Sequence, residues 1–576
     1  MCGISGYIGK QDASNTISAM IGAQSHRGPD ASGSYFDSGF AALGHNRLSI
    51  IDLSAEANQP FIDSSGRYIM VYNGEVYNYK EIRESLKGHY DFKTQSDTEV
   101  VLAAYMHYGS DCLNQFNGMF AFAIWDTHQK KLFAARDRFG VKPFYYTQNK
   151  NGFYFSSEMK AIRKVTENKE FNKTVFANYF AFGSYGYPYE TFIEGIHQLP
   201  GGHALEFSDS DIKVIQWYDF INNVAAVPTD LTLEEVKHRY LGLVKDSISL
   251  RFRADVPVGI NISGGIDSSL LLSLVNLRPD APQIKAYTFY TGDERYDELP
   301  WVEAMIAHTQ TPLTKVLFSA AEVTAYATLI SNFQEEPFGG IPTLAYAKLF
   351  QKAQQDGVKV ILDGQGMDEA WAGYDYYHTA SQQTIQGQTT HGSPFKTNCL
   401  QSSFLSMASK PDYPTPFDND LQNKQYRDLF YTKIPRALRF NDRISMAFST
   451  ELREPFLDYR LVEFAFAQPE HFKLQNGQTK FVLREILGDL VTDKVAHAPK
   501  RALQTPQREW MSNELKAQVE QTIGQLKTSR YNDWFDFKEM RDEWHRYQNG
   551  NQDSSFHLWQ WMNFSFLVAK LEDNGS

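Results

Sequence analysis

One stretch constrains the fold of this chain more than any other: residues 260–269, which read Ile-Asn-Ile-Ser-Gly-Gly-Ile-Asp-Ser-Ser. Apolar residues 256–260 predict a buried strand before it, and the leucine-rich residues 270–275 predict a packed helix after it. A glycine pair between a strand and a helix lets backbone N–H groups turn toward one point, where the helix adds its positive dipole end. The stretch therefore predicts an anion-binding loop, and an ordinary turn with a helix cap is the alternative.

The side chains of this loop favour a nucleotide phosphate. Ser263, Ser268 and Ser269 supply hydroxyl donors, and the carboxylate of Asp267 suits a divalent cation that holds a phosphate. The loop is not of the Walker type, because the lysine that reaches the outer phosphates is missing. The string Ser-Gly-Gly-x-Asp-Ser-Ser resembles the pyrophosphate loop of enzymes that cleave ATP between the α and β phosphates.

Length and composition bound the remaining possibilities. A chain of 576 residues is too long for one core and predicts two or three domains. Its formal net charge of −12 argues against a nucleic-acid partner. The sequence shows neither a signal peptide nor an apolar run long enough to cross a membrane, and its three cysteines favour neither disulfides nor zinc. We therefore expect a cytoplasmic protein without a membrane partner.

The first part of the chain, up to about residue 205, reads as β-rich, with helices expected at 13–23 and 97–108. Cys2 follows the initiator methionine, whose removal would make it the new N-terminus. A terminal cysteine combines a thiol with a pKa of about 8.5 and an amine with a pKa of about 8 that can accept the thiol proton. Cys2 is thus a candidate nucleophile, with a small buried thiol as the structural alternative.

Five motifs in this part occur in the order of a known domain. They resemble the glutaminase domain of class II glutamine amidotransferases over residues 2–205, which implies an αββα N-terminal-nucleophile sandwich. The motifs are Met1-Cys2-Gly3-Ile4-Ser5-Gly6, His26-Arg27-Gly28-Pro29-Asp30, Gly44-His45-Asn46-Arg47-Leu48-Ser49-Ile50-Ile51, Tyr72-Asn73-Gly74-Glu75-Val76-Tyr77-Asn78 and Ser96-Asp97-Thr98-Glu99.

The resemblance implies how glutamine is bound and attacked. The fork-shaped guanidinium of Arg47 suits the α-carboxylate of glutamine, and Asp97 suits its α-ammonium. Cys2 is the implied nucleophile, and the Asn73 side chain with the Gly74 backbone N–H forms the implied oxyanion hole. The further glutamine-binding residues that the resemblance implies are Leu48, Ile51, Asn73 and Glu75.

A polar stretch at 206–232 reads as a linker, and residues 233–576 read as a second domain. A helix expected at 233–251 is followed by alternating strands and helices, which predict a parallel α/β sheet. Loops at successive strand ends then open into one crevice. Asp267 and Asp368 would face each other there, and two carboxylates beside a pyrophosphate suggest Mg²⁺ ligands.

The second domain resembles the synthetase domain of glutamine-dependent asparagine synthetases, over about residues 236–515. Besides the two loops, the matching motifs are Asp442-Arg443-Ile444-Ser445-Met446-Ala447, Glu451-Leu452-Arg453-Glu454-Pro455-Phe456-Leu457-Asp458 and Lys480-Phe481-Val482-Leu483-Arg484. The resemblance implies an α/β parallel-sheet ATP pyrophosphatase domain in which Lys480 stabilises charge during adenylation and amination, while Gln365 and Tyr374 lie at the acceptor site. The implied ATP-binding residues are Phe252, Ser263, Gly264, Gly265, Asp267, Ser268, Ser269, Thr291, Asp363 and Gly364.

Two departures from the family pattern concern the acceptor. Gln365 replaces a glutamate in the second loop, and a neutral amide can neither bind an ammonium as an ion pair nor act as a base. The segment 451–455 is also altered, and we expect it to lie at the acceptor site. Residues 381–423, rich in Gln, Ser, Thr and Asn, read as a polar insertion near the site mouth. The aromatic run 179–186 reads either as core or as a lining of the domain junction.

The combined expectation is an ATP- and Mg²⁺-dependent ligase. Cys2 would hydrolyse glutamine, and ammonia would reach an acyl-adenylate through an internal passage, with AMP, pyrophosphate and glutamate released. Aspartate is the acceptor that the resemblance favours. Another carboxylate, such as a sugar acid or a natural-product precursor, is the alternative, and a β-lactam-forming, regulatory or base-modifying relative fits less well. A homodimer is compatible with the sequence.

Overall fold

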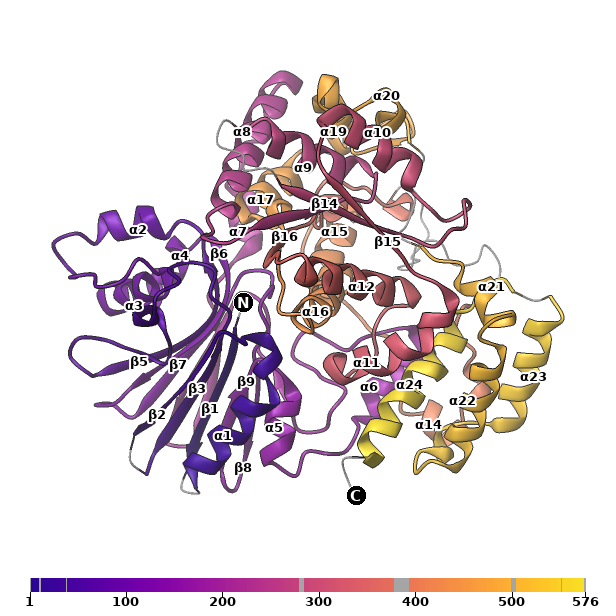
Figure 1. Ribbon diagram of the computed structural model, residues 1–576, viewed down its shortest axis with the longest axis horizontal. Coiled ribbons are helices and arrows are strands. Elements are labelled where there is room, and N and C mark those ends of the chain that lie inside the picture. The colour runs from indigo at the N-terminus through magenta and orange to yellow at the C-terminus, as the bar shows by residue number, and fades with distance from the viewer. Residues whose placement is uncertain are drawn as a thin grey trace.

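The computed structural model describes residues 2–9, 12–37, 39–278, 284–377, 393–498, 504–550 and 552–573. Two regions lie side by side in Figure 1, an N-terminal β-sandwich and a larger region built on a parallel sheet. The start of the chain lies where the two regions meet. Within the described ranges, no helix combines the length and apolarity needed to cross a membrane.

The N-terminal region stacks two antiparallel sheets, each with six strands in its described part. The first has the order β10-β8-β9-β1-β3-β2, with bounds His197–Gln198, Tyr145–Asn149, Gly152–Ser156, Gly3–Gly9, Ala41–Arg47 and Ala31–Asp37. The second has the order β12-β11-β7-β6-β5-β4, with bounds Asp211–Gln216, His203–Ser208, Lys131–Arg136, Gly118–Asp126, Tyr68–Val76 and Phe61–Ile62. Alternate side chains of both sheets, including Ile4, Val71, Trp125 and Phe155, fill the space between them.

Helices cover the two outer faces of this sandwich. On the first sheet lie α1 (Ala13–Ala23) and α5 (Met159–Val165), and on the second lie α2 (Tyr79–Ser85), α3 (Asp97–Tyr108) and α4 (Cys112–Gln115). Asp12 and Ser96 cap α1 and α3 by accepting hydrogen bonds from backbone N–H groups of the first turn. The αββα sandwich expected from the sequence is confirmed.

Part of the stretch read as a linker belongs to the second sheet. Strand β11 extends to Ser208 and pairs with β12 through a turn in which Asp209 and Ser210 have φ values of 50° and 68°. Two positive φ values in a two-residue loop match the twist of a hairpin. The alternation of Ile212 and Val214 with polar residues is the sequence signal for this edge strand. Helix α7 (Phe220–Ala225) follows it.

The second region is built on a five-stranded parallel sheet, as predicted; this count covers the described strands. Its order is β15-β14-β13-β16-β17, with bounds Leu313–Leu317, Lys285–Tyr290, Val258–Asn261, Val360–Leu362 and Glu451–Arg453. Helices α8 (Leu233–Arg251), α9 (Ile266–Asn276) and α10 (Leu299–Thr309) lie on one side of the sheet. Helices α12 (Ile341–Gln355) and α16 (Lys433–Met446) lie on the other.

Further helices and two short strands complete this region. They are α11 (Val323–Gln334), α13 (Met367–Ala370), α14 (Ser402–Leu405), α15 (Asp420–Phe430), α17 (Tyr459–Ala467), α18 (Glu470–Lys473), β18 (Leu474–Gln475), β19 (Gln478–Thr479), α19 (Phe481–Leu487), α20 (Asp493–Ala496), α21 (Gln507–Ser512), α22 (Lys516–Thr528), α23 (Phe537–Gln548) and α24 (Phe556–Asp573).

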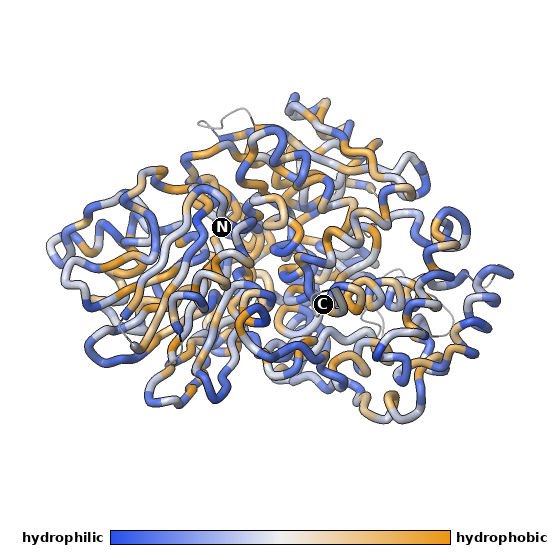
Figure 2. The backbone as a smooth tube through the Cα atoms, turned by 60° about the horizontal axis from the view of Figure 1, so that its bottom comes forward, coloured by the Kyte–Doolittle hydropathy of each residue, from blue (hydrophilic) through white to orange (hydrophobic). Residues whose placement is uncertain are grey.

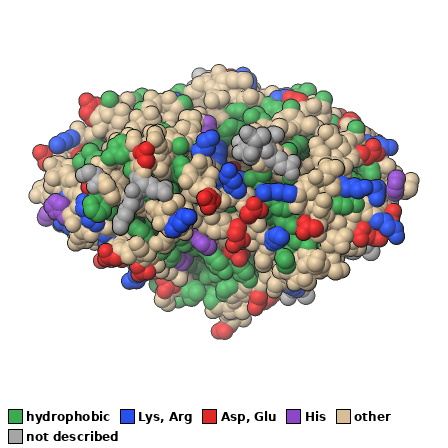
Figure 3. Space-filling view, turned by 90° about the horizontal axis from the view of Figure 1, so that it is seen from below, with side chains coloured by type: hydrophobic (Ala, Val, Ile, Leu, Met, Phe, Trp, Pro, Cys, Tyr) green, Lys and Arg blue, Asp and Glu red, His purple; other side chains and the backbone are tan. Residues whose placement is uncertain are grey.

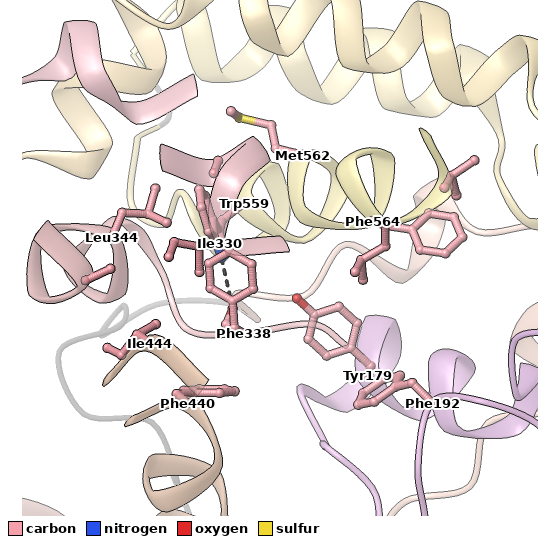
Figure 4. Packing of buried hydrophobic residues seen from close by; sticks show 14 of the residues in the cluster. Tyr179, Phe192, Ile330, Phe338, Leu344, Phe440, Ile444, Trp559, Met562 and Phe564 are labelled. Carbon is pink, nitrogen blue, oxygen red and sulfur yellow. Dashed lines mark hydrogen bonds between the residues drawn. The ribbon is translucent and has the colours of Figure 1, made fainter. Parts of the chain in front are cut away.

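One apolar cluster joins the two regions. Tyr179, on α6 (Lys173–Phe182), packs near Phe338, while Trp559 of α24 donates its indole N–H to the Phe338 carbonyl oxygen at 3.0 Å (Figure 4). Phe440 of α16 enters from the opposite side (Figure 4). The aromatic run that begins at Tyr179 thus contributes to the core and to the junction at once.

Hydropathy follows this arrangement. Hydrophobic segments concentrate inside both regions and where they meet, while the peripheral loops are hydrophilic (Figure 2). On the face shown in Figure 3, acidic and basic side chains are interspersed. The burial of the region junction fixes how the two candidate sites lie relative to each other.

Candidate active sites

Cys2 is buried at the start of β1, against the opposite sheet. Its backbone N–H donates to Asn73 Oδ1 of β5 at 2.9 Å, and its Sγ lies 4.0 Å from the Leu48 carbonyl oxygen. Burial raises the pKa of the Cys2 thiol, and the positive charge of Arg47 opposes that rise. Loss of the initiator methionine would place the α-amine of Cys2 at the position that now bonds Asn73.

The two residues expected to form an oxyanion hole lie beside this cysteine. Asn73 is fully buried, and its Nδ2 has no hydrogen-bond partner among the described residues. A buried donor without a partner is costly unless a ligand supplies the acceptor. Gly74 follows on the same strand, where a Cβ would lie 2.2 Å from the Met119 carbonyl oxygen, so only glycine fits.

Arg47 is held in place by backbone carbonyl groups. Its guanidinium donates to the Ser54 oxygen at 2.6 Å, to the Ile51 oxygen at 3.4 Å and to the Asp52 oxygen. No carboxylate of the described residues forms an ion pair with it, so its charge is available to a substrate carboxylate. Leu48 and Ile51 are buried next to it in the chain.

Asp97 and Glu75 form an acidic corner. Asp97, the first residue of α3, accepts from Tyr72 Oη at 2.8 Å and from the Val76 N–H at 3.0 Å. One oxygen of Glu75 is buried without a hydrogen-bond partner among the described residues, and the other lies 3.6 Å from a guanidinium nitrogen of Arg453. Burial raises the pKa of both carboxyl groups, because they lack enough positive charge, which an α-ammonium would supply.

A cavity of about 620 Å³ opens at the carboxyl ends of β13 and β16, where a parallel sheet is expected to bind its ligand. It brings together most of the residues expected to bind ATP and its acceptor. These are Ser263, Gly264, Gly265, Asp267, Ser268, Asp363, Gly364, Gln365, Asp368 and Lys480.

The loop between β13 and α9 has the expected geometry. Gly264 has a φ of 76°, and a Cβ there would lie 2.8 Å from the Cβ of Trp301. The Ser268 hydroxyl accepts from the Ser263 N–H at 3.2 Å, which closes the loop over the start of the helix. Across the cavity, Asp363 accepts from Tyr346 Oη at 2.5 Å and from the Gly364 N–H at 2.6 Å.

Three residues expected to bind ATP lie outside this lining. Ser269 is buried under the loop. Phe252 packs beneath the guanidinium of Arg278, whose Cζ lies 4.5 Å from the ring centroid. Thr291 donates its N–H and hydroxyl to Asp297. Their contribution to nucleotide binding remains a prediction.

Lys480 joins the two aspartates that were expected to face each other. Its Nζ lies 2.6 Å from an oxygen of Asp267 and 2.6 Å from Asp368 Oδ1. Lys480 has a left-handed backbone, with a φ of 56°, at the start of α19. A Cβ at Gly373 would lie 1.9 Å from Asp368 Oδ1 and 2.2 Å from Lys480 Cε, so this glycine makes room for the cluster.

The same pair of carboxylates fits the chemistry of Mg²⁺. Asp267 and Asp368 converge on one point from two loops, and Mg²⁺ is usually bound by one or two carboxylates plus substrate phosphates. The described residues contain no group of three or more His, Cys, Asp or Glu side chains arranged for a metal. The two carboxylates would therefore hold the ion only together with the ATP phosphates.

The two residues expected at the acceptor site, Gln365 and Tyr374, lie in different surroundings. Gln365 lines the cavity, whereas Tyr374 lies outside the lining and donates its hydroxyl to Glu369 at 2.6 Å. The placement of 451–455 at the acceptor site stays a prediction: Glu451 and Arg453 lie on β17 and are not among the described residues that line the cavity. Parallel pairing of β17 with β16 turns Arg453 toward Glu75 of the glutaminase site.

Sequence reasoning missed the residue that connects the two sites. Arg27 Nε donates to the Cys2 carbonyl oxygen at 3.0 Å, and its terminal nitrogens donate to both oxygens of Asp442 on α16. The motif around Arg27 was identified, but its partner is 415 residues away in the chain. The sequence carries no signal for this pairing, because burial of Arg27 and its proximity to Asp442 arise only when the two regions pack.

Comparisons with known proteins agree with both halves. The glutamine amidotransferase domain model matches residues 1–218, and the asparagine synthase model matches residues 239–571. A glutamine-hydrolysing asparagine synthetase of Bacillus subtilis is 29% identical, covering 92% of this chain and 91% of its own. A putative enzyme of that name from Mycobacterium tuberculosis is 30% identical, covering 99% and 97%. The amidase chry2 of Gibberella zeae is 28% identical, covering 91% and 92%.

Proposed function

Because this chain belongs to the asparagine synthase family and carries a glutamine amidotransferase domain, we propose that it is an ATP-dependent ligase that transfers the amide nitrogen of glutamine to a carboxylate. The observation that carries the proposal is the cluster of Lys480 between Asp267 and Asp368, on the cavity lined by the phosphate-binding loop. The ammonium of Lys480 can stabilise the negative charge that develops on the phosphates during adenylation.

The glutaminase half uses Cys2 as its nucleophile. The Cys2 thiolate attacks the side-chain carbonyl carbon of glutamine, and the Asn73 amide and the Gly74 N–H bind the oxyanion. Collapse of this intermediate releases ammonia and leaves a thioester on Cys2, which water hydrolyses to glutamate. Arg47 and the acidic pair of Glu75 and Asp97 hold the two charged ends of the amino acid.

The synthetase half activates the acceptor. A carboxylate oxygen attacks the α-phosphorus of ATP, pyrophosphate leaves, and ammonia then displaces AMP from the acyl carbon with loss of a proton. Mg²⁺, held by Asp267 and Asp368 with the phosphates, would neutralise charge on the leaving pyrophosphate. Lys480 offers its ammonium to the same oxygens, and the backbone around Gly264 and Gly265 binds the phosphates.

Ammonia has to cross the junction of the two regions. A cavity of about 20 Å³ lies there, lined by Met119 and Val141 from one region and by Arg251 and Glu454 from the other. A water-sized molecule needs about 10–15 Å³ of such space, and ammonia is of similar size. We place this cavity on the ammonia passage.

Two acceptors are candidates. The names of the relatives point to aspartate, which would give asparagine. The amide of Gln365 on the cavity wall favours a different carboxylate, because this side chain cannot form an ion pair with the α-ammonium of an amino acid.

Pyrophosphate release tests the proposal. Purified protein with ATP and Mg²⁺ is supplied with aspartate and either glutamine or an ammonium salt. Aspartate-dependent pyrophosphate and asparagine support the first acceptor. No stimulation by aspartate with either nitrogen source excludes asparagine synthesis and leaves the second acceptor class.

A further inference from the structure

A second cavity, of about 430 Å³, adjoins the synthetase cavity. Tyr185 and Arg436 line both cavities, so these two side chains lie where the cavities adjoin. One side of the second cavity is the segment 181–190, which comprises the end of α6 and the residues after it. The others are residues 393–413, the described start of the polar insertion, and the beginning of α16.

This cavity is walled by aromatic rings that hold one another in place. The Tyr187 and Tyr413 rings meet edge to face with centroids 5.9 Å apart, and Tyr413 packs on Tyr431 at 5.6 Å. Tyr187 Oη also donates to the Asp412 carbonyl oxygen at 2.8 Å, which ties the segment after α6 to the insertion. Rigid tyrosine faces of this kind pack well against rings of a ligand.

The basic side chains that line this cavity are only partly neutralised by carboxylates. Lys410 and Arg436 line the cavity, and neither forms an ion pair with a carboxylate within the described ranges. Arg439 is neutralised by Glu336 at 3.0 Å, and the acidic Glu190 accepts from the Tyr187 N–H at 2.8 Å. Lys410 is exposed and Arg436 lies 5.5 Å from the centroid of the Tyr185 ring, so no carboxylate of the described residues neutralises either charge, which favours an anionic group on the ligand.

We infer that the acceptor is larger than aspartate: a sugar acid that carries a phosphate, with its carboxylate in the synthetase cavity and its sugar phosphate in the second cavity. This inference rests on the proposed amidotransferase function. Arg436 lies at the boundary, where it can bind the acceptor while Gln365 faces the reacting carboxylate. Aspartate would leave the tyrosine-lined cavity and its two cations without a ligand.

Two sources of such a sugar acid, a free glycosyl phosphate and one linked to a nucleoside, share the chemistry that Lys410 and Arg436 recognise. The probes are therefore glucuronic acid 1-phosphate, its galacto epimer and UDP-glucuronate, each compared with aspartate. The readout is pyrophosphate released from ATP and Mg²⁺ with an ammonium salt, so that glutaminase activity is not needed.

Two variants test the second cavity without touching the ATP loops. Lys410→Glu should raise the KM for the active sugar acid about tenfold and change kcat little, because it reverses a charge that binds the phosphate. Ser184→Trp, on the same cavity, should remove most of the activity by filling it. Lys538→Glu, an exposed lysine on α23, is the matched control and should behave as wild type.

Glutamine hydrolysis of each variant, measured separately, reports whether it folds. Pyrophosphate release with one of the sugar acids, sensitive to Lys410→Glu, supports the inference, and the active probe identifies the source. Release with aspartate that Lys410→Glu does not affect overturns the inference and leaves the proposed function intact. No release with any of the three sugar acids also overturns it, whereas failure of glutamine hydrolysis in the wild type counts against the proposed function itself.

Discussion

Arg27 and Asp442 form a two-bond ion pair between the glutaminase and synthetase regions, with N–O distances of 2.9 and 3.1 Å. Arg27 also holds the Cys2 carbonyl oxygen, and Asp442 lies on α16, the helix that supplies Arg436 to both cavities. Two successive hydrogen-bonded contacts therefore link the backbone of Cys2 to α16, the helix that carries Arg436.

Asp442→Ala should destabilise the protein and impair glutamine use. Removing one partner of a buried ion pair typically costs about 3–5 kcal/mol, and here Glu158, whose Oε1 lies 2.9 Å from Arg27, retains part of the compensation. We expect a loss of about 3 kcal/mol in the free energy of unfolding, measured in urea, and a larger fall in glutamine-dependent than in ammonia-dependent amidation. Asp533→Ala, an exposed control, should change neither. Equal losses with both nitrogen sources would show that the pair does not act on Cys2.

Lys480→Ala should abolish the synthetase reaction whichever nitrogen source is used. Its ammonium is the one cation that contacts both Asp267 and Asp368 among the described residues, and loss of a charge-stabilising donor typically costs a factor of about 10²–10³ in rate. Pyrophosphate release is the measurement, and glutamine hydrolysis should persist. Substantial pyrophosphate release by this variant would remove Lys480 from the mechanism.

Gly373→Ala should act like a mutation of the active site although no charge is lost. The new Cβ would lie 1.9 Å from Asp368 Oδ1, so Asp368 and Lys480 must shift. We expect pyrophosphate release to fall at least about tenfold while glutamine hydrolysis is retained. Gly242→Ala on α8, where a Cβ meets nothing within 4 Å, is the matched control and should stabilise slightly. Full activity of Gly373→Ala would show that the cluster tolerates displacement.

Glu454 should make stability depend on pH. Burial raises its pKa to about 8 from an ordinary value of 4.5, with Lys142 opposing and Asp363 adding to the rise. The neutral form is thus favoured in the folded protein, and its stabilising contribution, complete below pH 4.5, is lost as the pH rises toward 8. Glu454→Gln cannot ionise, so its stability relative to wild type should increase between pH 5 and 8, by on the order of 3 kcal/mol.

The measurement is urea unfolding of both proteins at pH 5, 6.5 and 8. Glu451→Gln is a control from the same segment, because the pKa of Glu451 is shifted in the opposite direction from that of Glu454. Although burial alone would raise it, the pKa of Glu451 is held at about 2, in part by Arg453, whose Nε donates at 2.5 Å. That variant should lose stability at neutral pH. A stability difference for Glu454→Gln that stays constant with pH would contradict the account.

Many helices and the phosphate-binding loop could be predicted from the sequence, because the residues that determine them are neighbours in the chain. Helices 13–23, 97–108 and 233–251 have the expected bounds, since caps and apolar periodicity lie within each segment. The loop around Gly264 was predictable for the same reason. Arg27 was not, because its partner Asp442 is brought to it only by the packing of the two regions.

The surroundings of Glu451 and Arg453 were hidden for the same reason. The sheet order brings β17 next to β16, and Arg453 then lies 3.6 Å from Glu75 of the other region, which no local pattern indicates. The second cavity was equally hidden, because its walls come from three segments distant in sequence. Gln365, by contrast, was identified as unusual from the sequence because it replaces a glutamate of the family pattern.

Ammonia released at Cys2 is proposed to supply the synthetase cavity of the same chain. Cys2→Ala separates these two steps. Amide product and pyrophosphate are measured for wild type and variant with the active acceptor, first with glutamine and then with an ammonium salt. We expect Cys2→Ala to lose glutamine-dependent product but to keep forming ammonia-dependent product near the wild-type rate. Retained glutamine-dependent product, or loss of both activities in a variant that unfolds like wild type, would contradict it.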